Sequence, residues 1–392
     1  TLIDALFDGE LLPDFSVDKT TLGKNPFHLA DLTLFLPTRR SVRAAEDAIV
    51  RAVARRTGGG HAALLPQIYA IGDTDEADLI LQESASDPLT FKVNLRPAIP
   101  DIERHVALTE MVWAWSRALV KQVALLEPYE AVIIPASPAD AAKLASDLAG
   151  LLDEAENQNV DWANLKNLVP DDFARYWQLC LSFLDIVTKV WPDHLASIGR
   201  IDSMARRNKL IKIKADTLIA EATNAGPTIV AGSTGSVPVT ADLLKAVAEL
   251  PQGCVVLPGL DLELDDETWE AVGLDLNKVD HPDVAALGHP QAVLKTTLSR
   301  LNVSRDDVTP LAPQHTSMDA SRNRLLNEAL RPAETTDHWS MDSDGHASAL
   351  SNLSLIEARS SQEEALAVAV ALRETLDDPK QTSVALVTPD RN

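Results

Sequence analysis

The stretch that decides the fold is Thr228-Ile-Val-Ala231, followed by Gly232-Ser-Thr-Gly-Ser-Val-Pro238 and then by Cys254-Val-Val-Leu-Pro258. The first and last segments are short apolar runs rich in β-branched residues, which is typical of buried strands. The residues from Thr240 to Leu250 have the apolar spacing of a helix. A strand, a loop, a helix and a second strand predict a βαβ unit, so we expect an α/β fold with a parallel sheet.

Further elements extend this unit toward both ends of the chain. Leu32-Thr-Leu-Phe-Leu-Pro37 predicts another buried strand, followed by a helix that opens at Thr38, and Gln67 to Ile71 is strand-like. Residues 101–223 have almost entirely helical periodicity. Near the carboxyl end, Ser361 and Glu364 predict a capping box and Val384 to Val387 a terminal strand.

These patterns predict five segments, which follow in chain order. They are the first part of an α/β lobe (1–100), a helical insertion (101–225), the return to the lobe (226–330), a linker (331–350) and the start of a second α/β lobe (351–392).

Composition limits the class of protein. The 392 residues carry a net charge of −23, which excludes a generally basic nucleic-acid-coating protein, and 45% hydrophobic residues indicate a globular chain. No apolar run approaches the roughly 20 residues of a membrane-spanning helix, so we expect no membrane contact.

The two cysteines, Cys180 and Cys254, form no disulfide framework, which indicates a reducing, cytoplasmic compartment. Because the chain begins with Thr1 and stops soon after a β-branched run, we expect it to be a piece of a longer protein.

The first candidate site is the small-residue loop between a predicted strand and helix: Ala231, Gly232, Ser233, Thr234, Gly235 and Ser236. Backbone N–H groups and a helix N-terminus there could hold a phosphate. The loop lacks the lysine of a P-loop and the glycine spacing of a dinucleotide fingerprint, so a tight turn is the competing interpretation. The strand end also lacks the carboxylates that an active NTPase uses for Mg²⁺.

The second candidate is a basic group at the end of the strand that finishes at Pro37: Thr38, Arg39, Arg40 and Arg43. Arginines at a helix start can pair with phosphate. The competing interpretation is a solvated helix face with ion pairs to Asp47 or a similar residue. A further basic set, Arg206-Arg207-Asn208-Lys209 with Lys212 and Lys214, is a second candidate of this kind, for which an ordinary exposed helix face is the favoured interpretation.

No catalytic or metal-binding constellation is identified. The nine histidines match no metal-ligand motif, and Ser233 and Ser236 lie outside a nucleophile elbow. The acidic run from Asp261 to Glu267 is interpreted as a solvated loop.

Several motifs, in this order, resemble the amino-terminal part of the AddB family, in its alphaproteobacterial branch. They are Thr33-Leu-Phe-Leu-Pro-Thr-Arg-Arg40, Ala63-Leu-Leu-Pro-Gln-Ile68, Pro135-Ala-Ser-Pro-Ala-Asp140, Ala231-Gly-Ser-Thr-Gly-Ser-Val-Pro238, Val255-Val-Leu-Pro-Gly-Leu-Asp261, Ala329-Leu-Arg-Pro332 and Leu386-Val-Thr-Pro-Asp-Arg391. The resemblance runs over essentially the whole chain.

The resemblance implies a degenerate superfamily-1 helicase region with RecA-like (P-loop NTPase-type) lobes, within a protein that repairs double-strand breaks by homologous recombination. It implies an AddA-type helicase-nuclease subunit and DNA ends, single- and double-stranded, as partners. Thr38, Arg39 and Arg40 would correspond to a segment that contacts single-stranded DNA. An iron-sulfur cluster and Mg²⁺ would belong to a carboxy-terminal nuclease that this sequence does not contain, so we expect no cofactor here.

Two other functions stay open at the level of sequence. The chain could be a small-molecule or nucleotide-binding α/β enzyme that uses the loop at 232–236, or a pure assembly surface without DNA contact.

Overall fold

In the computed structural model, the described residues are 2–12, 14–58, 63–72, 95–123, 135–162, 174–273, 288–311, 317–339, 346–379 and 383–388. The chain divides into two compact units, Thr1–Pro313 and Gln314–Asn392. The first unit contains a four-stranded parallel sheet, which confirms the predicted α/β class and the predicted parallel pairing.

The sheet has the strand order β2-β1-β3-β4. Its strands are β1 (Thr33–Leu36), β2 (Gln67–Ala70), β3 (Thr228–Ala231) and β4 (Gly253–Val256), all within or next to the segments that the sequence predicted as strands. β1 pairs in register with β2 on one side and with β3 on the other, so that Leu34 lies opposite both Ile68 and Ile229.

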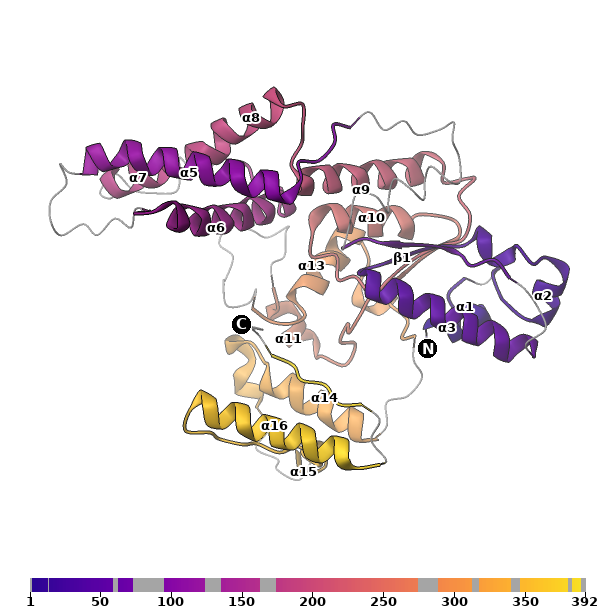
Figure 1. The fold of residues 1–392 in the computed structure, drawn as a ribbon. Coiled ribbons are helices and arrows are strands. Elements are labelled where there is room, and N and C mark those ends of the chain that lie inside the picture. The colour runs from indigo at the N-terminus through magenta and orange to yellow at the C-terminus, as the bar shows by residue number, and fades with distance from the viewer. Residues whose placement is uncertain are drawn as a thin grey trace. The chain divides into compact units, whose positions relative to one another are not determined.

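Helices cover both faces of the sheet, as Figure 1 shows for α1 and α3 on one side of β1 and α9 and α10 on the other. These helices are α1 (Leu2–Asp8), α3 (Arg39–Thr57), α9 (Ser203–Ala220) and α10 (Pro238–Ala248). Leu34 and Ile229 are buried in the core beneath α1 and α3, whereas Phe35 and Val230 are buried in the core beneath α9 and α10. Consecutive strand residues therefore reach opposite cores, which explains the continuous apolar runs of β1 and β3.

The predicted helical region is confirmed between β2 and β3. It contains α5 (Asp101–Val123), α6 (Pro138–Asn157), α7 (Ala174–Asp185), the π-helical turn η4 (Ile186–Val190) and α8 (Trp191–Ser197) before α9. α6 starts as predicted, with Ser137 as N-cap and Pro138 in the first turn. Leu108 and Val112 of α5 are fully buried in a separate core with Trp191.

The chain enters and leaves this helical region through two neighbouring segments. The amide of Ile99 donates to the carbonyl of Ile201 (3.0 Å), and the amide of Ile201 donates to the carbonyl of Pro97 (3.2 Å). Ala98 and Ile201 form an isolated parallel bridge. Residues a hundred positions apart in the chain thus meet beside the sheet.

The remaining short elements in the described part of the first unit are α2 (Lys19–Lys24), η1 (His28–Asp31), α11 (Asp266–Ala271), α13 (Ala292–Leu301) and η5 (Arg305–Asp307). α13 packs against α10. It lies close to the loop after β3, because Thr297 donates its hydroxyl to the carbonyl of Thr234 at 2.6 Å.

The second unit differs from the expected second α/β lobe. Its elements in the described residues are all helical: α14 (Ser317–Ala329), η6 (Ala333–His338), α15 (His346–Ala349) and α16 (Ser361–Asp377). The predicted strand at Val384–Val387 is wrong, because residues 383–388 have no regular secondary structure and are exposed. The extended run at 353–358 is likewise unpaired and mostly exposed. β-branched composition favours a strand, but a strand forms only against a neighbour.

Two local predictions in this unit also need correction. The sequence placed α14 with the sheet, but Arg322 of α14 donates to the carbonyls of Ala349 and Ser351 (3.1 and 2.6 Å), so α14 belongs with α15. The predicted linker at 331–350 contains η6 and α15. The N-cap of α16 is Ser360 rather than Ser361, since the Ser360 hydroxyl accepts from the amide of Glu363.

Candidate anion-binding site at the carboxyl edge of the sheet

The two sequence-predicted sites meet at one edge of the sheet. After β1 the chain passes through α3 to β2, and after β3 it passes through α10 to β4 on the opposite side. The two connections therefore diverge at the β1/β3 boundary, which is where open α/β sheets form ligand crevices. Gly232, just after β3, lies against Pro37, just after β1: a Cβ at Gly232 would be 3.5 Å from Cδ of Pro37.

Thr38 fixes the start of α3. Its Oγ1 accepts from the amide of Ser41 at 3.1 Å, and the Ser41 hydroxyl accepts from the amide of Thr38 at 3.0 Å, which completes a capping box. The hydroxyl of Thr38 is thus used within the helix cap. Its role in the predicted site is to fix where the first turn of α3 begins. The positive charge of the site comes from the arginines that follow.

The three predicted arginines lie in two different environments. Arg39 is half-buried and lines a cavity, whereas Arg40 is exposed and Arg43 lies at the surface of the same helix. Neither Arg40 nor Arg43 has an ion-pair partner among the described residues, and the predicted pairing of this face with Asp47 is not formed. The first turn of α3 contains no acidic residue. Cations at a helix N-terminus oppose the helix dipole, so this turn concentrates positive potential.

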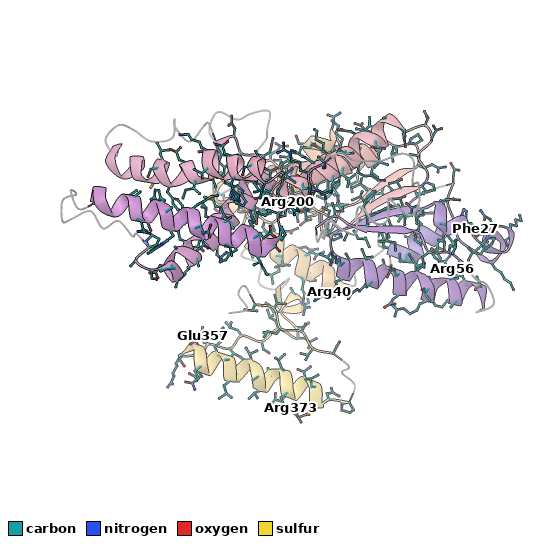
Figure 2. The ribbon with its side chains drawn as sticks, turned by 45° about the horizontal axis from the view of Figure 1, so that its top comes forward. Phe27, Arg40, Arg56, Arg200, Glu357 and Arg373 are labelled. Atoms are coloured by element: carbon teal, nitrogen blue, oxygen red, sulfur yellow. The ribbon has the colours of Figure 1, made fainter. Side chains whose placement is uncertain are left out.

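The other end of α3 uses its arginines differently. Arg55 pairs with Asp4 (3.0 Å) and Arg56 pairs with Asp8 (2.7 Å), both on α1. Figure 2 labels Arg40 near the beginning of α3 and Arg56 near its end. The arginines at the end of α3 therefore attach α3 to α1, while Arg40 and Arg43 remain available at the strand end.

The loop Ala231–Ser236 has no regular secondary structure after Ala231. Ala231 ends β3 and is buried, and the amide of Gly232 donates to the carbonyl of Val256 (2.9 Å). The amide of Gly235 donates to the hydroxyl of Ser233 (3.3 Å).

Packing against α13 also restricts this loop. Gly235 has φ +68°, and a Cβ there would lie 2.8 Å from Oγ1 of Thr297. α10 begins with Pro238, which has no N–H to offer a phosphate. The amides of Gly232 and Gly235 are thus used within the protein and Pro238 offers none, and these contacts favour the turn interpretation.

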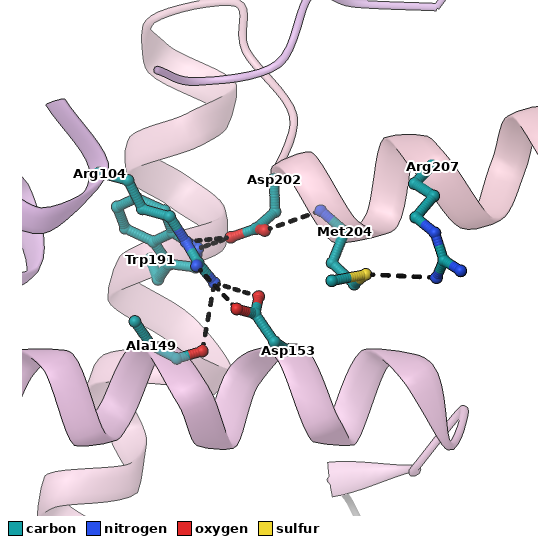
Figure 3. A network of polar contacts seen from close by, with 7 residues as sticks. All are labelled: Arg104, Ala149, Asp153, Trp191, Asp202, Met204 and Arg207. Carbon is teal, nitrogen blue, oxygen red and sulfur yellow. Dashed lines mark hydrogen bonds and ion pairs between the residues drawn. The ribbon is translucent and has the colours of Figure 1, made fainter. Parts of the chain in front are cut away.

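An ion-pair network around the buried Arg104 joins four helices near this edge (Figure 3). Arg104 of α5 donates from Nη2 and Nη1 to the two carboxylate oxygens of Asp153 on α6 (2.7 and 3.2 Å). Its Nε donates to Asp202 (3.1 Å), which also accepts from the indole of Trp191 (3.0 Å) and caps α9. A further Arg104 donor reaches the carbonyl of Ala149 (3.4 Å).

The charges of this network compensate one another. Burial alone would lower the pKa of the Arg104 guanidinium, but hydrogen bonds and charges from Asp153 and Asp202 outweigh it and hold that pKa above its ordinary value. Because its donors are directed at protein acceptors, Arg104 has a structural role. Sequence reasoning missed it, although Arg104 lies four residues before the buried Leu108 and so continues the apolar face of α5.

The basic set on α9 was interpreted as an ordinary exposed helix face, and this is wrong for its first two members. Arg206 is buried, and its Nε donates to the carbonyl of Arg96 (3.0 Å). Arg207 donates to the carbonyl of Ile71, just after β2. The sequence signal is again the spacing along the helix, because Arg206 lies four residues before the buried Leu210 and so on the same face.

One cavity of about 960 Å³ lies between the sheet edge and the helical region. Arg39 and Gly72 contribute from the sheet side. Among the described residues, the charged side chains of its lining are four arginines and two aspartates: Arg39, Arg104, Arg206, Arg207, Asp101 and Asp153. This described part of the lining thus holds more cationic than anionic side chains, in a chain whose net charge is −23.

The acidic run after β4 is accounted for by local contacts. Asp261 accepts from the amides of Glu263 and Leu264, and Asp265 caps α11. Asp266 pairs with Arg305 at 2.6 Å. Within the described ranges, no cluster of three or more histidine, cysteine or acidic side chains is placed to hold a metal ion. No helix in those ranges combines the length and apolarity needed to cross a bilayer.

The chain matches no family model, and neither a curated protein nor a solved structure matches it significantly.

Proposed function

We propose that this chain is a non-catalytic, DNA-handling region that binds single-stranded DNA through the first turn of α3. The proposal extends to an AddB-type subunit with a RecA-like, degenerate helicase fold, which acts in the cytoplasm on DNA ends together with an AddA-type motor. The sequence resemblance supports this wider assignment. The parallel sheet with its helical insertion is compatible with it.

The observation that carries the proposal is the contrast between the two ends of α3. Arg55 and Arg56 are paired with aspartates, whereas Arg40 and Arg43 lie at the carboxyl end of the central strand without a described ion-pair partner. Cationic side chains in the first turn weaken a helix. Residues that reduce local stability in this way are expected at functional sites. A phosphate backbone would neutralise these guanidinium groups by bidentate hydrogen bonds.

The test is a fluorescence-anisotropy titration of labelled single-stranded DNA at several salt concentrations. Arg40→Ala with Arg43→Ala should weaken binding and reduce the slope of log K against log salt by about 0.7 for each phosphate that the variant no longer neutralises. Arg51→Ala is the matched control, because Arg51 is exposed on the same helix but lies farther from the strand end. An unchanged slope and affinity in the double variant would rule out the proposed DNA site at the first turn of α3.

The small-molecule alternative makes the opposite prediction. Ser233→Asp places a carboxylate in the loop after β3. If the loop holds a phosphate, this variant should abolish nucleotide binding. If the loop is a turn, the variant should leave DNA binding intact. The contacts of Gly235 and Thr234 with Thr297 favour the second result.

A further inference from the structure

Helix α16 of the second unit is apolar but unburied. Its central residues, 365–372, are alanine, valine and leucine alone. No residue of α16 is buried, and none of the closely packed pairs of helices and strands in the described residues includes it. A helix that is apolar all round is ordinarily covered on all sides, so we expect a further partner for α16.

The side chains of α16 differ in exposure around the helix. Val368, Leu372 and Thr375 are half-buried and share one side. Five other residues follow one another at helical spacing and are all exposed: Leu366, Ala369, Val370, Arg373 and Leu376. We call these five residues the exposed face of α16. The leucine side chains of this face keep more than half of their surface in solvent, at 64% for Leu366 and 53% for Leu376.

The exposed face is complementary to itself when two copies of α16 run antiparallel. If Leu366 of one helix lies opposite Ala369 of the other, a large side chain meets a small one twice, once on each side of the two-fold axis. The same alignment brings Arg373 beside Glu363 of the other copy. This follows from the spacing, because Arg373 lies four residues after Ala369 and Glu363 lies three residues before Leu366.

The charges at the ends of the exposed face favour the antiparallel direction. Arg373 donates to Asp377 from Nε (2.9 Å), and both side chains are exposed. Since a guanidinium has five N–H donors, Arg373 can bind a second carboxylate without releasing Asp377. Glu363 is held at the first turn, where its Oε2 accepts from the amide of Arg359 (3.0 Å). A parallel pair would instead place each arginine beside its own copy, and like charges at such positions are destabilising.

We propose that the exposed face of α16 binds the same face of a second copy of this chain, as an antiparallel helix pair with two-fold symmetry. The match of Leu366 with Ala369 and of Arg373 with Glu363 favours this occupant. One helix face from each copy makes a small interface, so the dimer should be reversible. The arginines of α3 lie in the first unit and take no part in it.

Sedimentation equilibrium of the whole chain over a range of concentrations tests the proposal. The mass should rise with concentration from that of one chain to that of two, and no further, because a two-fold pair is closed. A chain that stays monomeric at every concentration would overturn the proposal, whether its own first unit covers the exposed face or nothing does. Growth beyond two chains would also contradict it.

Ala369→Glu tests the location of the interface. It places a charge against Leu366 of the other copy and should raise the dimer Kd by about tenfold or more, because a buried charge without a partner is costly. Ala371→Glu is the matched control: Ala371 is exposed on the same helix but points away from the exposed face. The control adds the same charge and should leave the Kd close to that of the wild type. Equal Kd values for the two variants would place the contact elsewhere and overturn the proposal.

A charge exchange tests the direction of the pair and remains informative if Ala369→Glu does not fold by circular dichroism. Glu363→Arg and Arg373→Glu should each weaken the dimer, because each places like charges together at both ends. The variant with both changes should recover the dimer, although it lacks the original pair of Arg373 with Asp377. Single changes without effect, or a double variant without recovery, would contradict the antiparallel alignment.

Discussion

The guanidinium of Arg207 on α9 donates twice to the carbonyl of Ile71, which follows β2. Its partners on the other side are Asn157, at the end of α6, and Asn208. A single side chain thus connects the sheet edge to the last turn of a helix in the insertion. The hydrogen bonds of Arg207 attach these two substructures to each other. Removing the Arg207 side chain should therefore change the stability of the chain measurably.

Arg207→Ala should lower the free energy of unfolding by about 1–3 kcal/mol, because the Ile71 carbonyl would be left without these donors. Urea unfolding followed by circular dichroism measures this change. Lys209→Ala is the control: Lys209 is exposed on the same helix, and such changes usually stay within about 0.5 kcal/mol. Equal effects of the two variants would contradict the attachment role.

Arg104→Ala should destabilise the chain by about 3–5 kcal/mol, because two carboxylates would be left near the core without their cation. Asp153→Asn should cost less, since Asp202 still pairs with Arg104. The double variant should cost less than the sum of the two single variants, and a double-mutant cycle in urea measures the coupling. Additive effects would show that the Arg104–Asp153 pair contributes nothing.

Gly235→Ala should destabilise the chain by about 1–3 kcal/mol, because φ is +68° and the new Cβ would overlap Thr297. Thr297 is buried and bonded to Thr234, so it cannot easily move. Gly150→Ala is the matched opposite, since Gly150 lies at the surface of α6 with no atom within 4 Å of the added Cβ. That change should stabilise the chain by about 0.4–1 kcal/mol. Thermal unfolding of both variants tests the pair, and similar shifts would be inconsistent with a packed turn at Gly235.

Cys254 should react slowly with iodoacetamide in the folded chain. Burial raises the pKa of its thiol, and the thiolate is the reactive form. The rate should therefore rise with pH, with a midpoint above the ordinary value of about 8.5. The unfolded state releases this proton first, so this group's contribution to stability falls as the pH rises through that range. In a Cys180→Ser background, equal rates with and without urea would rule out protection by the fold.

The sheet was predictable because its strands are buried on both faces. Apolar runs such as Leu34 to Leu36 and Ile229 to Ala231 need no alternation, and the helix between β3 and β4 imposes parallel pairing. The same argument failed at Val384–Val387, because an apolar run indicates the tendency to form a strand but supplies no neighbour to pair with. Helix caps were placed to within one residue, as the shift from Ser361 to Ser360 shows.

The site was predictable only in part. The segments at Thr38 and Gly232 follow buried strands, so the parallel sheet brings them to one edge. The roles of Arg104, Asp153 and Asp202 depend on the packing of α5, α6 and α9, and nothing local in the sequence brings these residues together. What these residues share in the sequence is a charged side chain spaced so that it falls on the apolar face of a helix. Sequence reasoning treats such a charged side chain as exposed to solvent.

The paired segments at Ala98 and Ile201 have a consequence for how this architecture can change. A chain that departs and returns at the same point can omit or exchange the intervening residues without altering the order of the strands. The remaining link between β2 and β3 would include α9 and would keep the backbone hydrogen bonds between Ile201 and the segment from Pro97 to Ile99. The strand order of the sheet therefore does not depend on the helices between residues 101 and 200, which leave and rejoin the rest of the chain at one place.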